Sequence, residues 1–167
     1  RPFPTMTILE NVMLAATNQL GERFWNTWFM PKQVRRQERE IRDRAREIIQ
    51  FCNLAHLESQ VAGSISGGQK KLLELARVLM SDPQLILLDE PAAGVNPALL
   101  DVLVEKIVEL NERGKTFLII EHNMDMVMSL CDPIVVLAQG RVLCTGTPEQ
   151  VAADPAVIDA YLGEVAA

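Results

Sequence analysis

Two short, continuous apolar runs constrain the fold of this chain more than any other feature. Residues 85–88 (LILL) and 117–120 (FLII) have the length of strands and contain no polar side chain. We expect strands that are buried on both faces to read this way, as in parallel sheets covered by helices. Between the runs, Asn96 and Pro97 suit the N-cap and the first position of a helix. The order strand, helix, strand predicts a mostly parallel α/β sheet.

The segments around these runs predict a division into two parts. Residues 1–83 have a helical pattern, and residues 84–167 form an α/β core that includes a hairpin over residues 134–145. Ser66 and Gln69 have the spacing of a capping box, which predicts the start of a helix. From periodicity and capping residues we expect helices over residues 7–19, 32–52, 66–82, 97–112, 124–130 and, in two short pieces, 147–161.

The composition excludes several classes of protein. With 49% apolar and 23% charged residues the chain is an ordinary globular sequence, and its net charge of −6 argues against a nucleic-acid-binding surface. No apolar stretch approaches the roughly 20 residues needed to span a bilayer. Cys52, Cys131 and Cys144 show no metal-type spacing and indicate reduced, buried thiols of a cytosolic protein.

The first candidate site is the segment over residues 65–69, ISGGQ. Capping explains Ser66 and Gln69 but does not explain two glycines, since glycine inside a helix costs about 1 kcal/mol relative to alanine. Glycine is usually retained where another group approaches the backbone closely. The start of a helix carries partial positive charge and free N–H groups, so the segment predicts a phosphate-binding surface.

The other two candidate sites follow the apolar runs. Asp89 and Glu90 come directly after the first run, where Asp suits Mg²⁺ and Glu suits a proton acceptor for an attacking water. His122 follows the second run, next to Glu121. A polar turn explains the acidic pair equally well, and a lone histidine is more often structural than catalytic.

The joint order of these sites resembles the ABC-type ATPase family. Residues 65–69 resemble its signature motif, with Ile in place of the usual Leu, and residues 85–90 resemble its Walker B motif. Residues 92–96 resemble its D-loop, with Asn at the end where many members have Asp, and His122 resembles its switch histidine. The resemblance implies a partial P-loop NTPase fold, with a helical subdomain and a parallel-sheet core lacking its N-terminal strands.

Some phrases resemble one branch of that family more closely. Residues 7–12, 93–97, 120–124 and 161–163 are similar to the branched-chain amino-acid uptake ATPases, although related importers share several of these phrases. No G-x-x-x-x-G-K-[ST] loop occurs in the sequence, and that loop would hold the phosphates of the chain's own ATP. We therefore expect a fragment without ATPase activity of its own, with an exposed sheet edge and marginal stability.

The resemblance implies a role for each candidate residue. In the family, two ATPase domains pair head to tail around two ATP molecules. Asp89 would help to hold Mg²⁺, Glu90 would polarise the attacking water, and His122 would contact the γ-phosphate and the partner's D-loop. The implied contacts to ATP held by a partner are Ser66, Gly67, Gly68 and Gln69, with Asn96 in the D-loop.

For the whole protein, the resemblance implies an ATP-hydrolysing importer subunit, with branched-chain amino acids as the expected solutes. Its expected partners are a second ATPase subunit, transmembrane permease subunits and, indirectly, a solute-binding protein, with no nucleic acid. The expected location is the cytoplasmic face of the membrane. Two alternatives stay open: a soluble ABC ATPase outside transport, and a non-catalytic interaction fragment. The aromatic residues at 24–30 either pack within the helical part or contact the permease.

Overall fold

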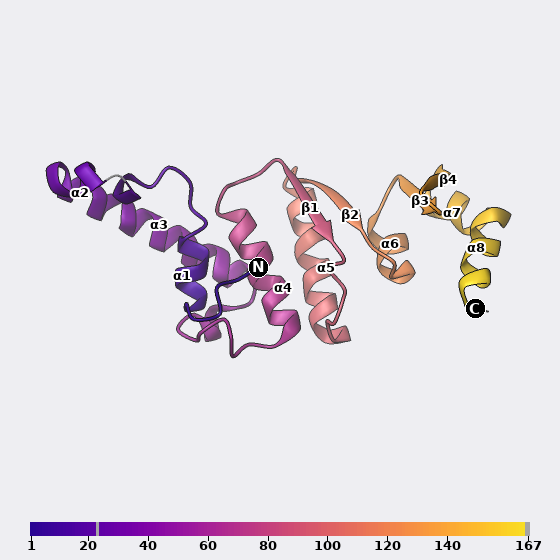
Figure 1. Ribbon diagram of the computed structural model, residues 1–167, viewed down its shortest axis with the longest axis horizontal. Coiled ribbons are helices and arrows are strands. Elements are labelled where there is room, and N and C mark those ends of the chain that lie inside the picture. The colour runs from indigo at the N-terminus through magenta and orange to yellow at the C-terminus, as the bar shows by residue number, and fades with distance from the viewer. Residues whose placement is uncertain (23, 166–167) are drawn as a thin grey trace. The chain divides into compact units, whose positions relative to one another are not determined.

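The computed structural model describes residues 1–22 and 24–165 and is shown in Figure 1. Contacts divide the chain into two compact units, Arg1–Leu118 and Ile119–Ala167. The expected division at residue 83, between a helical part and an α/β core, stays a prediction. Within the described ranges, no helix combines the length and the apolar character that crossing a bilayer requires.

The first unit is built mainly from helices that pack on α4. α4 contacts α1, α3 and α5, and its side chains Leu72, Leu73 and Ala76 are buried. Each fully buried leucine contributes about 1.5–3 kcal/mol, so α4 is the centre of this core. The elements are α1 (Ile8–Met13), η1 (Leu20–Glu22), α2 (Phe24–Phe29), α3 (Pro31–Phe51), η2 (Ala55–Leu57), α4 (Gly67–Leu79), β1 (Leu85–Asp89), α5 (Pro97–Glu112) and, at the boundary between the units, β2 (Thr116–Ile120).

The first helix is shorter than the sequence predicts. It begins at a capping box in which the amide of Glu10 donates to Thr7 Oγ1, and it ends at Met13 rather than at residue 19. The side-chain amide of Gln19 donates to the carbonyls of Met13 and Ala16, which supplies the partners that a continuing helix would have provided. The apolar periodicity after Met13 was therefore misleading.

The buried side chain of Asn11 fixes the start of the chain. Its Oδ1 accepts from the amide of Phe3 at 2.7 Å, and its Nδ2 donates to the carbonyls of Phe3 at 3.0 Å and Thr7 at 2.9 Å. A buried amide is tolerated only when its hydrogen bonds are made. Asn11 thus ties the segment before α1 to α1 itself.

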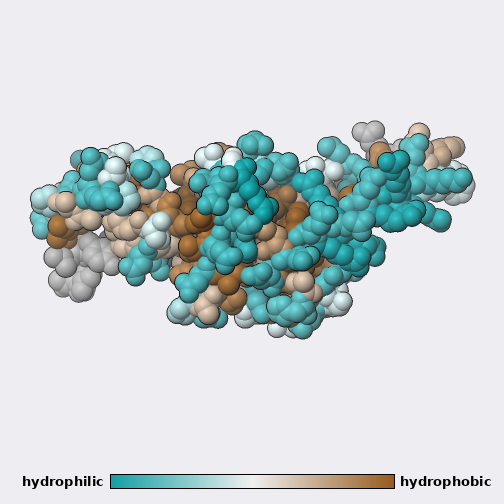
Figure 2. All heavy atoms as spheres, turned by 180° about the vertical axis from the view of Figure 1, so that it is seen from behind, coloured by the Kyte–Doolittle hydropathy of each residue, from teal (hydrophilic) through white to brown (hydrophobic). Residues whose placement is uncertain are grey.

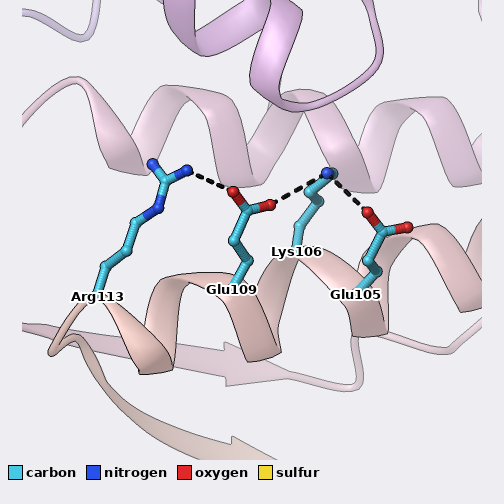
Figure 3. A network of polar contacts seen from close by, with 4 residues as sticks. All are labelled: Glu105, Lys106, Glu109 and Arg113. Carbon is cyan, nitrogen blue, oxygen red and sulfur yellow. Dashed lines mark hydrogen bonds and ion pairs between the residues drawn. The ribbon is translucent and has the colours of Figure 1, made fainter.

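A polar network runs along α5 (Figure 3), and its two cations contact Phe51 at the end of α3. Lys106 is only 8% exposed, and its Nζ lies 3.0 Å from Glu105 and 3.3 Å from Glu109. The hydrogen bond to Glu105 is the main cause that raises the pKa of Lys106. Arg113 pairs with Glu109, and both cations lie over the ring of Phe51. The charges are therefore paired where the two helices meet.

β1 and β2 form a two-stranded parallel sheet connected through α5, in agreement with the predicted α/β class. The C-terminal end of α5 has a glycine turn: Gly114 has φ +87°, and the amide of Lys115 donates to the carbonyl of Leu110. The expected burial on both faces is wrong. Ile86 is 1% exposed, but Leu87 is 66% exposed, because only one face is covered within the described part of the chain.

The second unit contains α6 (Met124–Leu130), β3 (Ile134–Ala138), β4 (Arg141–Gly146), α7 (Pro148–Ala152) and α8 (Pro155–Val165). β3 and β4 pair antiparallel across Gln139 and Gly140, whose φ angles of 50° and 74° confirm the predicted hairpin turn. Its small core centres on Ile134, Val151 and Val157.

The three cysteines are free thiols, as predicted, but they are not equally buried. Cys52 is fully buried in the first unit, and burial raises the pKa of its thiol to about 12. Cys131 and Cys144 are only partly buried and pack against the core of the second unit. The expectation of buried thiols therefore holds fully for Cys52 alone.

Candidate functional site

The start of α4 is held by the capping box that the sequence predicts. The amide of Gln69 donates to Ser66 Oγ at 3.3 Å, and the amide of Ser66 donates to Gln69 Oε1 at 2.9 Å. Ser66 is exposed, so this turn lies open to solvent. The first amides of a helix have no partner within the helix, and those of Gly67 and Gly68 belong to this turn. The turn can accept an anion.

The two glycines have a reason within the chain that the sequence alone did not reveal. A Cβ atom at Gly68 would lie 2.7 Å from Leu99 Cδ1 and 3.1 Å from Val95 Cγ1. A Cβ atom at Gly67 would lie 3.2 Å from the carbonyl oxygen of Gly94. We expected another group to approach the backbone of these glycines closely. In the structure that group is the loop before α5 together with the first turn of α5. Phosphate binding is an additional role that this packing neither requires nor prevents.

The acidic pair lies in a tight turn at the end of β1. Asp89 is the last residue of the strand, and Glu90 has a left-handed backbone with φ +46°. The carbonyl of Glu90 accepts from the amide of Ala93 at 3.2 Å, and Gly94 is also left-handed at φ +70°. Both carboxylates are exposed. The turn presents them to solvent at the carboxyl end of the strand, where ligands of α/β sheets usually bind.

Lys71 connects the start of α4 to this acidic turn. Its Nζ donates to the carbonyl oxygen of Glu90 at 3.0 Å. The sequence did not point to Lys71, since a lysine two residues after a capping box carries no signal for a contact 19 positions away. The structure thus brings two of the predicted sites, the segment over residues 65–69 and the acidic pair, into one region of the first unit.

Asn96 caps α5 as predicted. Its Oδ1 accepts from the amide of Leu99 at 2.9 Å, and Pro97 follows at the first helical position. Asn and Asp are about equally good N-caps, so Asn96 preserves the helix start although many members of the family have Asp at this position.

His122 lies in the second unit, where its exposed side chain follows β2. The carboxylate of Glu121 is fully buried and accepts from the amides of His122 at 2.9 Å and Asn123 at 3.0 Å. Glu121 therefore orients the backbone that carries the histidine, a role that the sequence did not predict. The expected contact of His122 with the γ-phosphate and the partner's D-loop stays a prediction.

Asp89 is the residue that suits a magnesium ion. Among the residues with a described position, no three His, Cys, Asp or Glu side chains gather to hold a metal. Mg²⁺ nevertheless needs only one or two protein carboxylates when phosphates and waters complete its shell. The exposed carboxylate of Asp89 at a strand end fits that limited requirement.

The aromatic residues of α2 do not pack into the first unit's core. Trp25 is 69% exposed and Trp28 is 76% exposed, so packing within the helical part does not account for them. The side chain of Phe24 lies outside the described residues. The alternative, contact with a partner, remains.

Comparisons with known proteins agree with these motifs. A family model described as "ABC transporter" matches residues 1–93, and one described as "Branched-chain amino acid ATP-binding cassette transporter" matches residues 141–167. The chain is 41% identical to a probable branched-chain amino acid transport ATP-binding protein of Archaeoglobus fulgidus over 163 residues, covering 98% of this chain and 62% of the relative. It is 43% identical to a high-affinity branched-chain amino acid transport ATP-binding protein of Pseudomonas aeruginosa, covering 98% and 65%.

A solved structure is also similar over most of the chain. The crystal structure of a nucleotide-free ATP-binding cassette from an ABC transporter superposes with a TM-score of 0.77 at 37% identity, covering 95% of this chain and 63% of that one. The chain therefore spans less than two thirds of the length of these relatives.

Proposed function

Because this chain belongs to the ABC transporter family, we propose that it supplies most of an ATP-hydrolysing transporter subunit. The observation that carries the proposal is the junction of the α4 start with the Asp89–Glu90 turn through Lys71. An anion-accepting helix start and a pair of exposed carboxylates together suit a nucleotide phosphate and its magnesium ion. The names of the relatives and the match over residues 141–167 support branched-chain amino acids as the transported solutes.

In this proposal each candidate residue has a separate role in ATP binding or hydrolysis. Asp89 holds Mg²⁺, which when bound neutralises charge on the phosphates. Glu90 accepts the proton of the attacking water, since an exposed carboxylate at the strand end is available for that step. The α4 start, comprising Ser66, Gly67, Gly68 and Gln69, contacts the γ-phosphate of ATP that a second ATPase subunit holds. Asn96 assists at the same interface. His122, in the second unit, contacts a γ-phosphate, the role that the family resemblance implies.

The proposed partners follow from the same roles. The proposed contact of the α4 start with a γ-phosphate requires a second ATPase subunit that presents the nucleotide. Permease subunits would provide the path across the bilayer, and a solute-binding protein would act through them. The protein would then work at the cytoplasmic face of the membrane, held there through the permease.

The test uses the whole protein that contains this chain, purified together with its permease. We expect ATP hydrolysis that is lost in Glu90→Gln, while ATP binding, measured separately, is retained because the phosphate contacts are unchanged. Asp101→Asn, which neutralises an exposed carboxyl on α5, is the matched control and should keep full activity. Full turnover by Glu90→Gln would refute the catalytic assignment. Uptake of labelled leucine into proteoliposomes tests the solute separately.

A further inference from the structure

The helix α2 presents an aromatic surface to solvent. Trp25, Trp28 and Phe29 are 69%, 76% and 70% exposed. Their spacing of three and four residues places them on one side of the helix. The rings of Trp25 and Phe29 stack with their centroids 6.2 Å apart, which joins them into one surface. Exposed apolar surface of this kind marks a site of interaction rather than a solvated face.

A strip of positive charge begins immediately after this surface. Lys32, Arg35, Arg36 and Arg39 line one depression on α3 together with Glu40 and Asp43. Arg36 pairs with Glu40, but both side chains are more than half exposed, so the pair contributes little. α3 carries seven of the chain's 16 Lys and Arg and only four of its 22 Asp and Glu. Positive charge is thus concentrated on this helix although the whole chain has a net charge of −6.

The two features adjoin within the first unit, because α2 contacts α3. Figure 2 shows hydrophilic side chains over α3, with apolar ones at the end of the view where α2 lies. We propose that this aromatic–basic face docks on the surface of an anionic lipid bilayer. We define the face by Trp25, Trp28 and Phe29 of α2 with Lys32, Arg35 and Arg39 of α3.

Both the aromatic part and the basic part of the face have a counterpart in a lipid surface. Tryptophan and phenylalanine insert at the depth of the headgroups, while lysine and arginine bind the lipid phosphates just above. Each basic residue near an anionic surface strengthens binding roughly fivefold, and the attraction falls off within a Debye length. The basic side chains succeed one another along α3 over residues 32–39, around an open depression on the helix surface. A row of charges of this length suits an extended charged plane better than a single acidic side chain. The proposal does not depend on ATP hydrolysis.

The chain offers a direct optical test, because its only two tryptophans are Trp25 and Trp28. The purified chain is mixed with phosphatidylcholine vesicles that contain or lack phosphatidylglycerol, and binding is measured by sedimentation and by tryptophan emission. We expect binding and a blue shift with phosphatidylglycerol only, both reversed by high salt. Binding without an emission shift would place the contact elsewhere on the chain and overturn the proposal, as would equal binding to both vesicles.

Paired variants distinguish binding through the aromatic–basic face from a general effect of the chain's charge or exposed apolar side chains. Arg35→Gln with Arg39→Gln should weaken binding by about 25-fold, whereas Arg113→Gln with Arg141→Gln, which removes the same charge outside the face, should not. Phe29→Ala should weaken binding, whereas Leu137→Ala, at a side chain of similar exposure, should not. Equal effects of the face and control variants would refute the proposal, and so would a chain that binds only purified permease and no vesicle.

Discussion

Lys71 holds the backbone of Glu90 in place through a hydrogen bond of 3.0 Å from its Nζ to the carbonyl oxygen. The same carbonyl accepts the amide of Ala93, so it lies at the centre of the acidic turn. Glu90 has an unfavourable left-handed backbone for a residue other than glycine, and these two bonds help to maintain it. The orientation of the proposed proton acceptor is thus linked to α4.

The first prediction concerns this bond. Lys71→Met keeps the length of the side chain but removes the donor, so we expect the free energy of unfolding to fall by about 0.5–1.5 kcal/mol. In the whole protein, the maximal rate of ATP hydrolysis should fall more than the affinity for ATP, because Glu90 is displaced while the phosphate contacts remain. The matched control is Lys70→Met, which removes the same charge from the same helical turn. Equal effects of the two variants on that rate would contradict a positioning role for Lys71.

The second prediction concerns the packing of Gly68. Gly68→Ala places a methyl group 2.7 Å from Leu99 Cδ1 and 3.0 Å from its Cβ, so the side chain of Leu99 must move and its Cβ must give way by a few tenths of an ångström. We expect a loss of about 1–3 kcal/mol in the free energy of unfolding, as for other overpacked sites. Gly21→Ala is the control, since its nearest neighbour would be Val34 Cγ1 at 3.6 Å. Urea unfolding curves measure both, and an unchanged midpoint for Gly68→Ala would show that the contact yields easily.

The third prediction concerns acid stability. The hydrogen bond from Lys115 holds the pKa of Asp82 below its usual value, so the pair stabilises the fold at neutral pH. This contribution is complete above the unfolded pKa of about 3.9 and is lost as the pH falls through the lower folded value. Asp82→Asn should therefore lose less stability than the wild type between pH 6 and pH 3. Asn also tolerates the left-handed backbone of this position, at φ +49°.

Urea midpoints measured across that pH range test the Asp82 prediction. Asp101→Asn removes a carboxyl from α5 and should leave the acid-induced loss of stability as it is in the wild type. If the Asp82 and Asp101 variants follow the same pH profile, the Asp82–Lys115 pair is not the source of the difference.

The fourth prediction concerns the thiols. At pH 8 a pKa of about 12 leaves only about one Cys52 in ten thousand as thiolate, and the side chain is also fully buried. A thiol reagent should therefore modify Cys131 and Cys144 in the folded chain and reach Cys52 only on unfolding. Cys52→Ala should remove the part of the modification that requires unfolding. Rapid modification of all three thiols without denaturant would show that the first unit opens readily.

Local signals in the sequence predicted the local structure well. Ser66 and Asn96 are N-caps where their side chains suggested, and the turn at Gln139 and Gly140 forms the predicted hairpin. Each of these depends on a few neighbouring residues, whose preferences act within one turn of chain. The fold class followed from the alternation of such elements.

Features that depend on distant partners could not be predicted in the same way. The Lys71 contact with Glu90 and the packing of Gly68 on Leu99 join separate elements, and no short pattern encodes them. The apolar run of β1 predicted burial on both faces, yet Leu87 is 66% exposed. An apolar run indicates which faces a strand can bury, but the elements that cover those faces belong to other segments of the chain.

The fit of Gly67 and Gly68 against the residues from Gly94 to Leu99 has a mechanical consequence. With less than van der Waals room for even one methyl group at Gly68, the start of α4 and the start of α5 have no clearance in which to slide independently. We therefore expect a displacement of either helix start to move the other as well. If the starts of α4 and α5 belong to two neighbouring nucleotide sites, a displacement at one site would therefore also move the other.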